Sequence, residues 1–256
     1  MAMNEVFEFN DGPEWLRGFR NLVLTEIPSW FRTMKWWGQF IWVFLMSNVI
    51  LIFTFLGGET EETLMLYNIF QGLYPVFGIL IVMQSTMIGE KQSGTAAWIL
   101  SKPVSRTGFI LAKFVINALA STLFIIILPG IIGYLEITLI GGIEVSFLGF
   151  FLGNVALWLH MMFFLTMSLL VGTLFNTRRA VLTVGITFFV MEVFLIGMLP
   201  QELFVAALAF PDPNMSIAES LMIGAPIFSI WPIIIAIISC IIFVLLAIWR
   251  FKKEEF

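Results

Sequence analysis

The chain contains very little of the chemistry on which most enzymes and secreted proteins depend. Its 256 residues include one cysteine, Cys240, and one histidine, His160. A single cysteine excludes an intramolecular disulfide and a cysteine-rich metal site. One histidine cannot supply the pair of helical ligands found in many zinc sites, so no bound metal is expected. Only 12% of the residues are charged, against about a quarter in an average soluble domain.

Several motifs are also absent. No Gly-x-x-x-x-Gly-Lys-Ser/Thr segment is present, so the chain has no loop that could cradle nucleotide phosphates. No basic cluster is interleaved with aromatic residues, which argues against a nucleic-acid partner. Residues 1–11 are acidic and lack a continuous apolar core, so they do not resemble a signal peptide. The sequence therefore predicts a chain that binds no cofactor itself.

Long apolar stretches make up most of what is present. Hydrophobic residues account for 60% of the chain, and six stretches are close to the roughly 20 residues that a helix needs to cross a bilayer. Lipid offers no partners to an open backbone, so each stretch is expected to be helical. Pro129 should leave the carbonyl of Ile125 without its helical partner and kink the third span. The six predicted spans are 36–56, 66–88, 109–135, 147–174, 180–199 and 227–249.

The charges alternate in sign from one gap between spans to the next. Lysine and arginine occur before the first span, around the second and fourth gaps, and after the last span. The other gaps hold only acids, such as Glu61, Glu144 and Glu202. Basic flanking residues resist translocation, so the basic regions and both termini are expected in the cytoplasm. The thirteen basic residues are Arg17, Arg20, Arg32, Lys35, Lys91, Lys102, Arg106, Lys113, Arg178, Arg179, Arg250, Lys252 and Lys253.

Two segments outside the spans are also expected to be helical. In 13–35, apolar residues recur at helical spacing, which predicts an amphipathic helix in the cytoplasmic interface, ended by Pro28. A short soluble helix is the alternative there. The outer segment 200–226 holds two short apolar pieces that predict a re-entrant or interfacial hairpin. Ser216 and Glu219 have the spacing of a capping box that would start the second piece.

The loop after the second span has an unusual apolar centre. It is polar at both ends, yet residues 95–100 form a short apolar helix-like piece that presents Trp98, Ile99 and Leu100. An apolar piece exposed in a cytoplasmic loop is most simply a docking element. Gly94 precedes this piece and is expected to adopt a backbone conformation closed to branched residues.

This loop resembles the first cytoplasmic loop of the ABC-2 family of ABC-transporter permeases. The family pattern is Glu-Lys-x-x-Gly-Thr, a short apolar helix, Ser-x-Pro-Val-Ser-Arg and then a basic residue. The matching positions here are Glu90, Lys91, Gly94, Thr95, Ser101, Pro103, Val104, Ser105, Arg106 and Lys113. The resemblance implies that the loop is a coupling helix seated in a groove of a separate ATPase subunit. The ten residues expected to couple the permease to that subunit are Glu90, Lys91, Gly94, Thr95, Trp98, Ile99, Leu100, Ser101, Pro103 and Arg106. The resemblance also implies two permease units with two ATPase units, and ATP and magnesium bound by the ATPase.

Two ionisable residues lie within predicted spans. His160 is near the middle of the fourth span, and Glu192 is about two turns from the outer end of the fifth. Such groups are functional candidates by default, because they are costly in lipid. A neutral, hydrogen-bonding role between helices is the alternative for His160. Glu192 could be protonated, face a transport path or reach water.

The sequence thus predicts an all-α membrane protein with six transmembrane helices. Residues 1–35 form a cytoplasmic N-terminus, 36–250 the membrane domain and 251–256 a cytoplasmic tail; the coupling loop is 89–108 and the re-entrant segment 200–226. The predicted function is ATP-driven export of a hydrophobic or amphipathic substrate across a prokaryotic plasma membrane, by a homodimer of permeases. The alternatives are an intramembrane enzyme that uses Glu192 and His160, and a membrane scaffold or immunity protein without transport.

Overall fold

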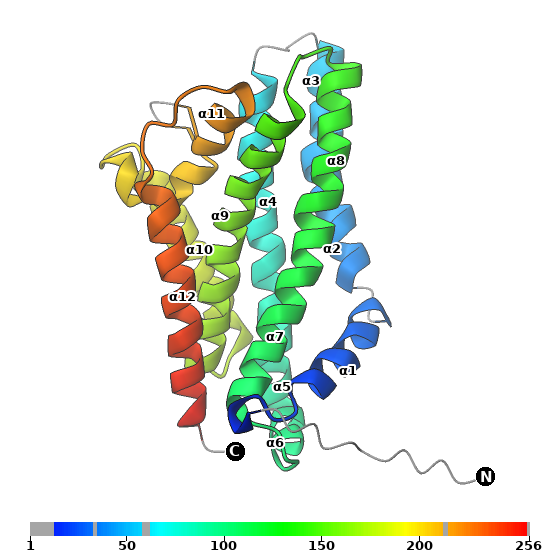
Figure 1. Ribbon diagram of the computed structural model, residues 1–256, viewed down its shortest axis with the longest axis vertical. Coiled ribbons are helices and arrows are strands. Elements are labelled where there is room, and N and C mark those ends of the chain that lie inside the picture. Colours follow the sequence, from blue (N-terminus) through cyan, green and yellow to red (C-terminus); the bar gives the residue numbers. More distant parts are fainter. Residues whose placement is uncertain (1–12, 33–34, 58–61, 212–214, 255–256) are drawn as a thin grey trace, which may run out of the picture.

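A computed structural model describes residues 13–32, 35–57, 62–211 and 215–254, and within these ranges every regular element is a helix (Figure 1). The predictions for residues 1–12, Glu61, Asp212 and the last two residues lie outside this part. The elements are η1 (Glu14–Leu16), α1 (Phe19–Arg32), α2 (Lys35–Val43), η2 (Phe44–Val49), α3 (Ile50–Gly57), α4 (Thr63–Met83), η3 (Gln84–Ile88), α5 (Gly89–Gln92), α6 (Thr95–Leu100), α7 (Arg106–Ser121), η4 (Thr122–Ile127), α8 (Leu128–Leu135), η5 (Glu136–Ile140), α9 (Phe147–Leu174), α10 (Arg178–Leu195), η6 (Gln201–Leu203), η7 (Val205–Leu208), α11 (Ile217–Ile223) and α12 (Trp231–Lys252).

Four helices in the described ranges are long and apolar enough to cross a membrane: Thr63–Gln92, Arg106–Ile140, Phe147–Leu174 and Trp231–Lys252. They correspond to the second, third, fourth and sixth predicted spans. The first predicted span contains a shorter apolar helix, Phe40–Leu56. The fifth corresponds to α10, whose 18 residues include three charges, Arg178, Arg179 and Glu192. Length and composition therefore identify four of the six predicted spans.

The helix that contains Pro129 changes its geometry just before this residue. The segment η4 is a π-helix, in which backbone hydrogen bonds join residues five apart instead of four. The carbonyl of Ile125, expected to lose its helical partner, accepts a hydrogen bond from Gln71 Nε2 on α4 at 2.7 Å. A side chain of a neighbouring helix thus satisfies the backbone group that proline frees.

The core of the bundle is built around α9, which lies between α4 and α12 (Figure 1). Residues spaced along α9 are fully buried, among them Leu157, Phe164 and Leu169. At Gly153 the helix passes so close to α11 that an added Cβ would be 2.5 Å from Met222 Cγ and 2.7 Å from the carbonyl of Ala218. Small residues let helices approach in this way, and such packing holds bundles together in lipid.

The two ends of the bundle differ in content. One end, called the base from here on, carries α6, the start of α7 and the end of α12, whereas α11 lies at the opposite, far end (Figure 1). The loop that follows α9 also belongs to the base, since Gln92 Nε2 donates to the carbonyl of Asn176 at 3.0 Å. Eleven of the thirteen lysines and arginines belong to elements or loops that meet at the base; the side chains of Arg32 and Lys35 lie outside the described part.

The amphipathic segment before the first span forms η1 and α1, and α1 packs against α7. Leu22 and Val23 are partly buried against the bundle, while Leu24 and Ile27 are exposed. The prediction that Pro28 ends this helix is wrong, because α1 continues to Arg32 with Pro28 inside it. A proline removes one hydrogen bond from a helix, and a helix can continue past it with a bend.

Candidate functional site

The short helix α6 begins at a glycine in the left-handed region. Gly94 has φ +73° and ψ 1°, and an added Cβ would meet no atom within 4 Å. Any strain on substitution would therefore come from the backbone conformation, which side chains other than glycine seldom adopt. The expectation that Gly94 needs a conformation closed to branched residues is confirmed. The conformation turns the chain from α5 into α6.

One face of α6 points away from the bundle. Trp98 is 61% exposed, and Thr95 and Ser101 beside it are exposed as well. The ammonium group of Lys102 lies 3.5 Å from the centre of the Trp98 ring, a cation–π contact that helps to fix its orientation. Pro103 is also exposed and ends this surface. The protein therefore presents a large, positioned aromatic side chain at the tip of the base.

The opposite face of α6 packs inward. Ala96 is buried, and Ile99 and Leu100 are half-buried against a cluster that includes Phe109 and Phe251. Of the three apolar residues predicted to be presented together, only Trp98 is largely exposed. Ile99 and Leu100 seat the helix on the bundle.

A serine joins the end of the loop to the N-terminal segment. Ser105 Oγ accepts from the backbone N–H of Gly108 at 2.9 Å, which caps α7, and donates to the carbonyl of Trp15 at 2.6 Å. The backbone N–H of Ser105 donates to the carbonyl of Arg17 at 2.9 Å. Both bonds hold η1 against the loop, so the N-terminal helix is fixed to the same base.

A buried lysine forms the ionic centre of the base. Lys113 on α7 has a side chain that is only 1% exposed, and its ammonium pairs with the carboxylates of Glu26 on α1 and Glu90 on α5. Buried charges are stable only when they are paired and hydrogen-bonded. Glu90, predicted to contact an ATPase, is thus directed toward the bundle.

Lys91 and Arg106 are also directed inward, to the end of α12. The structure therefore gathers the ten predicted coupling residues in one place but divides them into two groups. Thr95, Trp98, Ser101 and Pro103 are exposed with Gly94 at the surface, and the remaining five pack or pair inside the base: Glu90, Lys91, Ile99, Leu100 and Arg106.

Sequence reasoning missed two acidic members of this site, Glu26 and Glu254. One signal could have found Glu26: Lys113 lies four residues inside the predicted third span, and a charge at that depth needs a partner. Glu26 is the one acid in the described part of α1, so it was an available partner. Nothing in the sequence pattern pointed to Glu254.

The two intramembrane candidates have separate surroundings. His160 is 1% exposed and lies among the rings of Phe164, Phe189 and Phe210, with centroids 5.2 to 6.5 Å away. Glu192 accepts a hydrogen bond from the backbone N–H of Val205 at 3.3 Å and so holds η7 against α10. This arrangement gives Glu192 a hydrogen bond to the backbone of η7 and gives His160 an aromatic environment.

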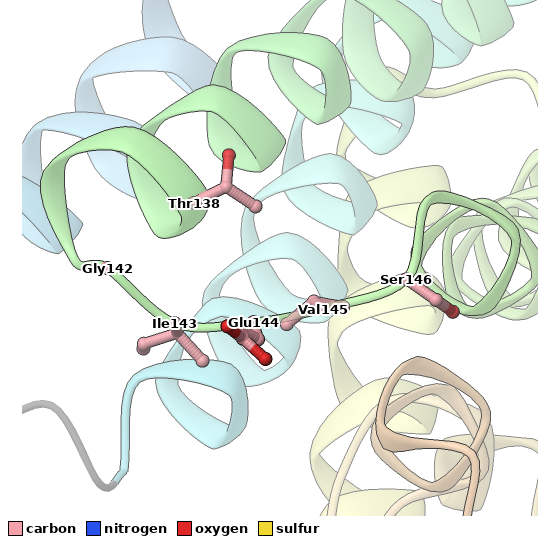
Figure 2. Close-up of a pocket in the computed structure, with 6 residues that line it drawn as sticks. All are labelled: Thr138, Gly142, Ile143, Glu144, Val145 and Ser146. Atoms are coloured by element: carbon pink, nitrogen blue, oxygen red, sulfur yellow. The ribbon is translucent and has the colours of Figure 1, made fainter.

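A hollow of about 670 Å³ lies at the far end, beside the loop before α9 (Figure 2). Glu144 is exposed on this loop. The hollow contains none of the predicted site residues, and it lies at the opposite end from the base. The residues that line it are Thr138, Gly142, Ile143, Glu144, Val145 and Ser146.

The far end also holds the predicted capping box. Ser216 Oγ accepts from the backbone N–H of Glu219 at 3.1 Å, and α11 starts at the next residue after Ser216, as predicted. Burial raises the pKa of the Glu219 carboxyl, and its hydrogen bond with the Ser216 backbone opposes that rise. Within the preceding piece, residues 205–210 are all buried, so this segment packs into the far end of the bundle.

Comparison with known proteins gives one family. The model of the ABC-2 family transporter proteins matches residues 25–256, which is nearly the whole chain and includes α6 and the end of α12. A comparison with curated proteins gives no match.

Proposed function

Because the chain belongs to the ABC-2 family of transporter proteins, we propose that it is the permease subunit of an ATP-driven exporter whose ATPase is a separate chain. The observation that carries this proposal is the exposed Trp98 on a short helix that is otherwise anchored at the base. Large aromatic side chains at the centre of an interface commonly supply much of its binding energy. ATP and magnesium would be bound by the partner, since this sequence has no phosphate-binding loop.

In the membrane, the proposed unit has six spans. The continuous helix that runs through α2, η2 and α3 and the helix α10 would be the first and fifth, in addition to the four that meet the length and composition limits. The gathering of basic residues at the base supports a cytoplasmic base with both termini inside the cell. Each of the proposed extra spans has an exposed apolar surface, including Ile41 and Leu45 on one and Val190 and Phe194 on the other.

The proposed assembly is a homodimer with two ATPase subunits. One unit has few helices with which to enclose a path, and the apolar surfaces of the first and fifth spans would face their counterparts in the second copy. The proposed cargo is hydrophobic or amphipathic, such as a peptide, a lipid-linked molecule or a drug. Movement of α6 by the ATPase would tilt the spans and alternate access to the two sides.

Affinity purification of the tagged chain from its own membranes tests this function. An ATP-binding subunit should be recovered with it, and ATP hydrolysis should require that subunit. Purified permease that hydrolyses ATP at a transporter-like rate by itself would overturn the proposal. Recovery of the permease without any ATP-binding partner would do so as well.

A further inference from the structure

The end of α12 is bonded to residues that precede and follow α6 in the chain, Lys91 and Arg106. Arg106, which follows α6, donates from Nη1 to the carbonyls of Phe251, Lys252 and Glu254 at 3.4, 2.7 and 2.6 Å. The last carbonyls of a helix have no partner within it and carry partial negative charge, so an arginine is well suited to cap them. Arg106, the first residue of α7, therefore holds the last turn of α12.

Lys91, which precedes α6, makes a second contact with the end of α12 through Glu254. Lys91 Nζ is 2.7 Å from Glu254 Oε1 and donates to the carbonyl of Thr173 at 3.2 Å. The two charged side chains are only 7% and 15% exposed. Because a buried charge that loses its partner is costly, this pair resists separation.

An aromatic layer lies beneath these polar contacts. The rings of Phe251 and Phe109 are stacked with centroids 5.2 Å apart and planes 2° from parallel, and Phe251 is fully buried. Phe109 is one turn into α7, so the stack also joins α12 to the helix that follows α6. Phe251, the carbonyl of Lys252 and Glu254 are thus held by contacts from Lys91, Arg106 and Phe109.

We propose that Phe251, the backbone carbonyl of Lys252 and Glu254 form a coupling strut, which passes the movement of α6 to α12. The chain itself links α6 only to the continuous helix Thr63–Gln92, which ends in α5, and to α7, because these precede and follow it. Lys91 and Arg106 extend that linkage to a helix that is distant in sequence, and they act as positioning residues inside the permease and not as contacts to the ATPase. This inference rests on the proposed function, in which an ATPase moves α6. Coupling of this kind travels through packed and hydrogen-bonded side chains.

The test uses the purified complex of permease and ATPase in lipid nanodiscs. A nitroxide is placed on Lys252→Cys in a Cys240→Ser background, because the Lys252 side chain is exposed and only its carbonyl belongs to the strut. Its spectrum is recorded without nucleotide and after trapping with ATP, magnesium and vanadate. The variants are Glu254→Gln, Lys91→Met and the exchange Lys91→Glu with Glu254→Lys. The control is Lys253→Met, which removes a neighbouring cation that lies over Trp249.

The labelled permease that keeps both Lys91 and Glu254, and the Lys253→Met control, should show a change in the nitroxide spectrum on trapping. Glu254→Gln and Lys91→Met should lose this change while recovery of the complex stays within about twofold of the original, and the exchange should restore it. A full spectral change in both single variants would overturn the strut. Loss of the complex in both single variants would show instead that the two residues bind the ATPase, and an exchange that restores nothing would show that their pairing is not what matters.

Failure of the proposed function gives a different pattern. In that case the permease with Lys91 and Glu254 unchanged would recover no ATPase, or the spectrum of its nitroxide would not respond to nucleotide. That result would overturn the strut together with the function on which it rests. A response in that permease that survives every substitution would remove the strut alone.

Discussion

Lys113 is a single side chain that holds together three elements from distant parts of the chain. Its two carboxylate partners come from α1 and α5, while Lys113 itself belongs to α7. The carboxylates are partly exposed, at 22% and 21%, whereas the lysine is almost completely buried. The lysine is therefore the group whose stability depends on pairing, and either carboxylate is placed to pair with it.

This sharing predicts a strongly non-additive double substitution. Glu26→Gln or Glu90→Gln alone should lower the unfolding free energy by about 1 kcal/mol or less, as for a partly exposed ion pair. Both together should cost about 3 kcal/mol or more, because the buried ammonium then has no carboxylate. Unfolding in detergent micelles measures the effect, with Glu14→Gln on the exposed end of η1 as the control. Simple addition of the two single effects would contradict a shared lysine.

Trp98 gives the prediction for docking at the residue scale. Trp98→Ala should weaken association with the ATPase by about 2 kcal/mol or more, which is the range of an interface hot spot. The abundance of the permease should not change, because the ring is exposed and supports no core packing. Leu100→Ala is the matched comparison: its side chain packs on the bundle, so it should lower abundance first. Pull-down recovery and membrane abundance are measured together, and normal recovery of Trp98→Ala would remove α6 as the docking element.

At the scale of elements, short sequence signals correctly predicted the features that depend only on adjacent residues. The capping box at Ser216 and the left-handed Gly94 follow from a few adjacent residues, and both are present. The prediction placed the end of α1 at Pro28, but the residues on both sides of this proline are helical and α1 continues to Arg32. The bond from Gln71 to the carbonyl of Ile125 could not be predicted, because it depends on which helices lie side by side.

Close packing between α9 and α11 gives a prediction for that pair of elements. Gly153→Val would place atoms against Met222 and the carbonyl of Ala218, and overpacking of this kind costs about 1 to 3 kcal/mol. We expect lower thermal stability in detergent, with α11 loosened from the far end. Gly38→Ala is the control, since a Cβ there meets no atom within 4 Å. Equal melting temperatures for the two variants would show that α9 and α11 are not this close in the protein.

For the whole molecule, composition and charge patterning predicted an all-helical membrane protein with its basic residues on one side. The family match and the helical architecture agree with an all-helical membrane protein, and the sidedness of the basic residues stays a prediction. The division of the coupling residues into an exposed and an inward group was not predicted. A short motif shows which residues occur together, whereas the direction of each side chain depends on the helices packed around it, as for Lys91 and Arg106.

The orientation of the molecule is open to direct measurement. In a Cys240→Ser background, a cysteine at Glu144 should react with an impermeant thiol reagent added to intact cells, whereas cysteines at Ser101 and Asn176 should not. All three positions are exposed, so differences in labelling report the side of the membrane and not burial. Disruption of the cells should make Ser101 and Asn176 reactive. Labelling of Ser101 in intact cells would reverse the proposed topology.

The contact between Lys91 and Glu254 also has a consequence for the order in which the protein is made. The two residues are 163 positions apart, whereas Glu90 and Lys113 are separated by 23. A chain is synthesised from its N-terminus, so Lys113 can meet Glu90 early, but Lys91 must wait for the last helix to leave the ribosome. The base is therefore finished only after α12 has been made, and a chain without α12 would carry α6 on an incomplete support.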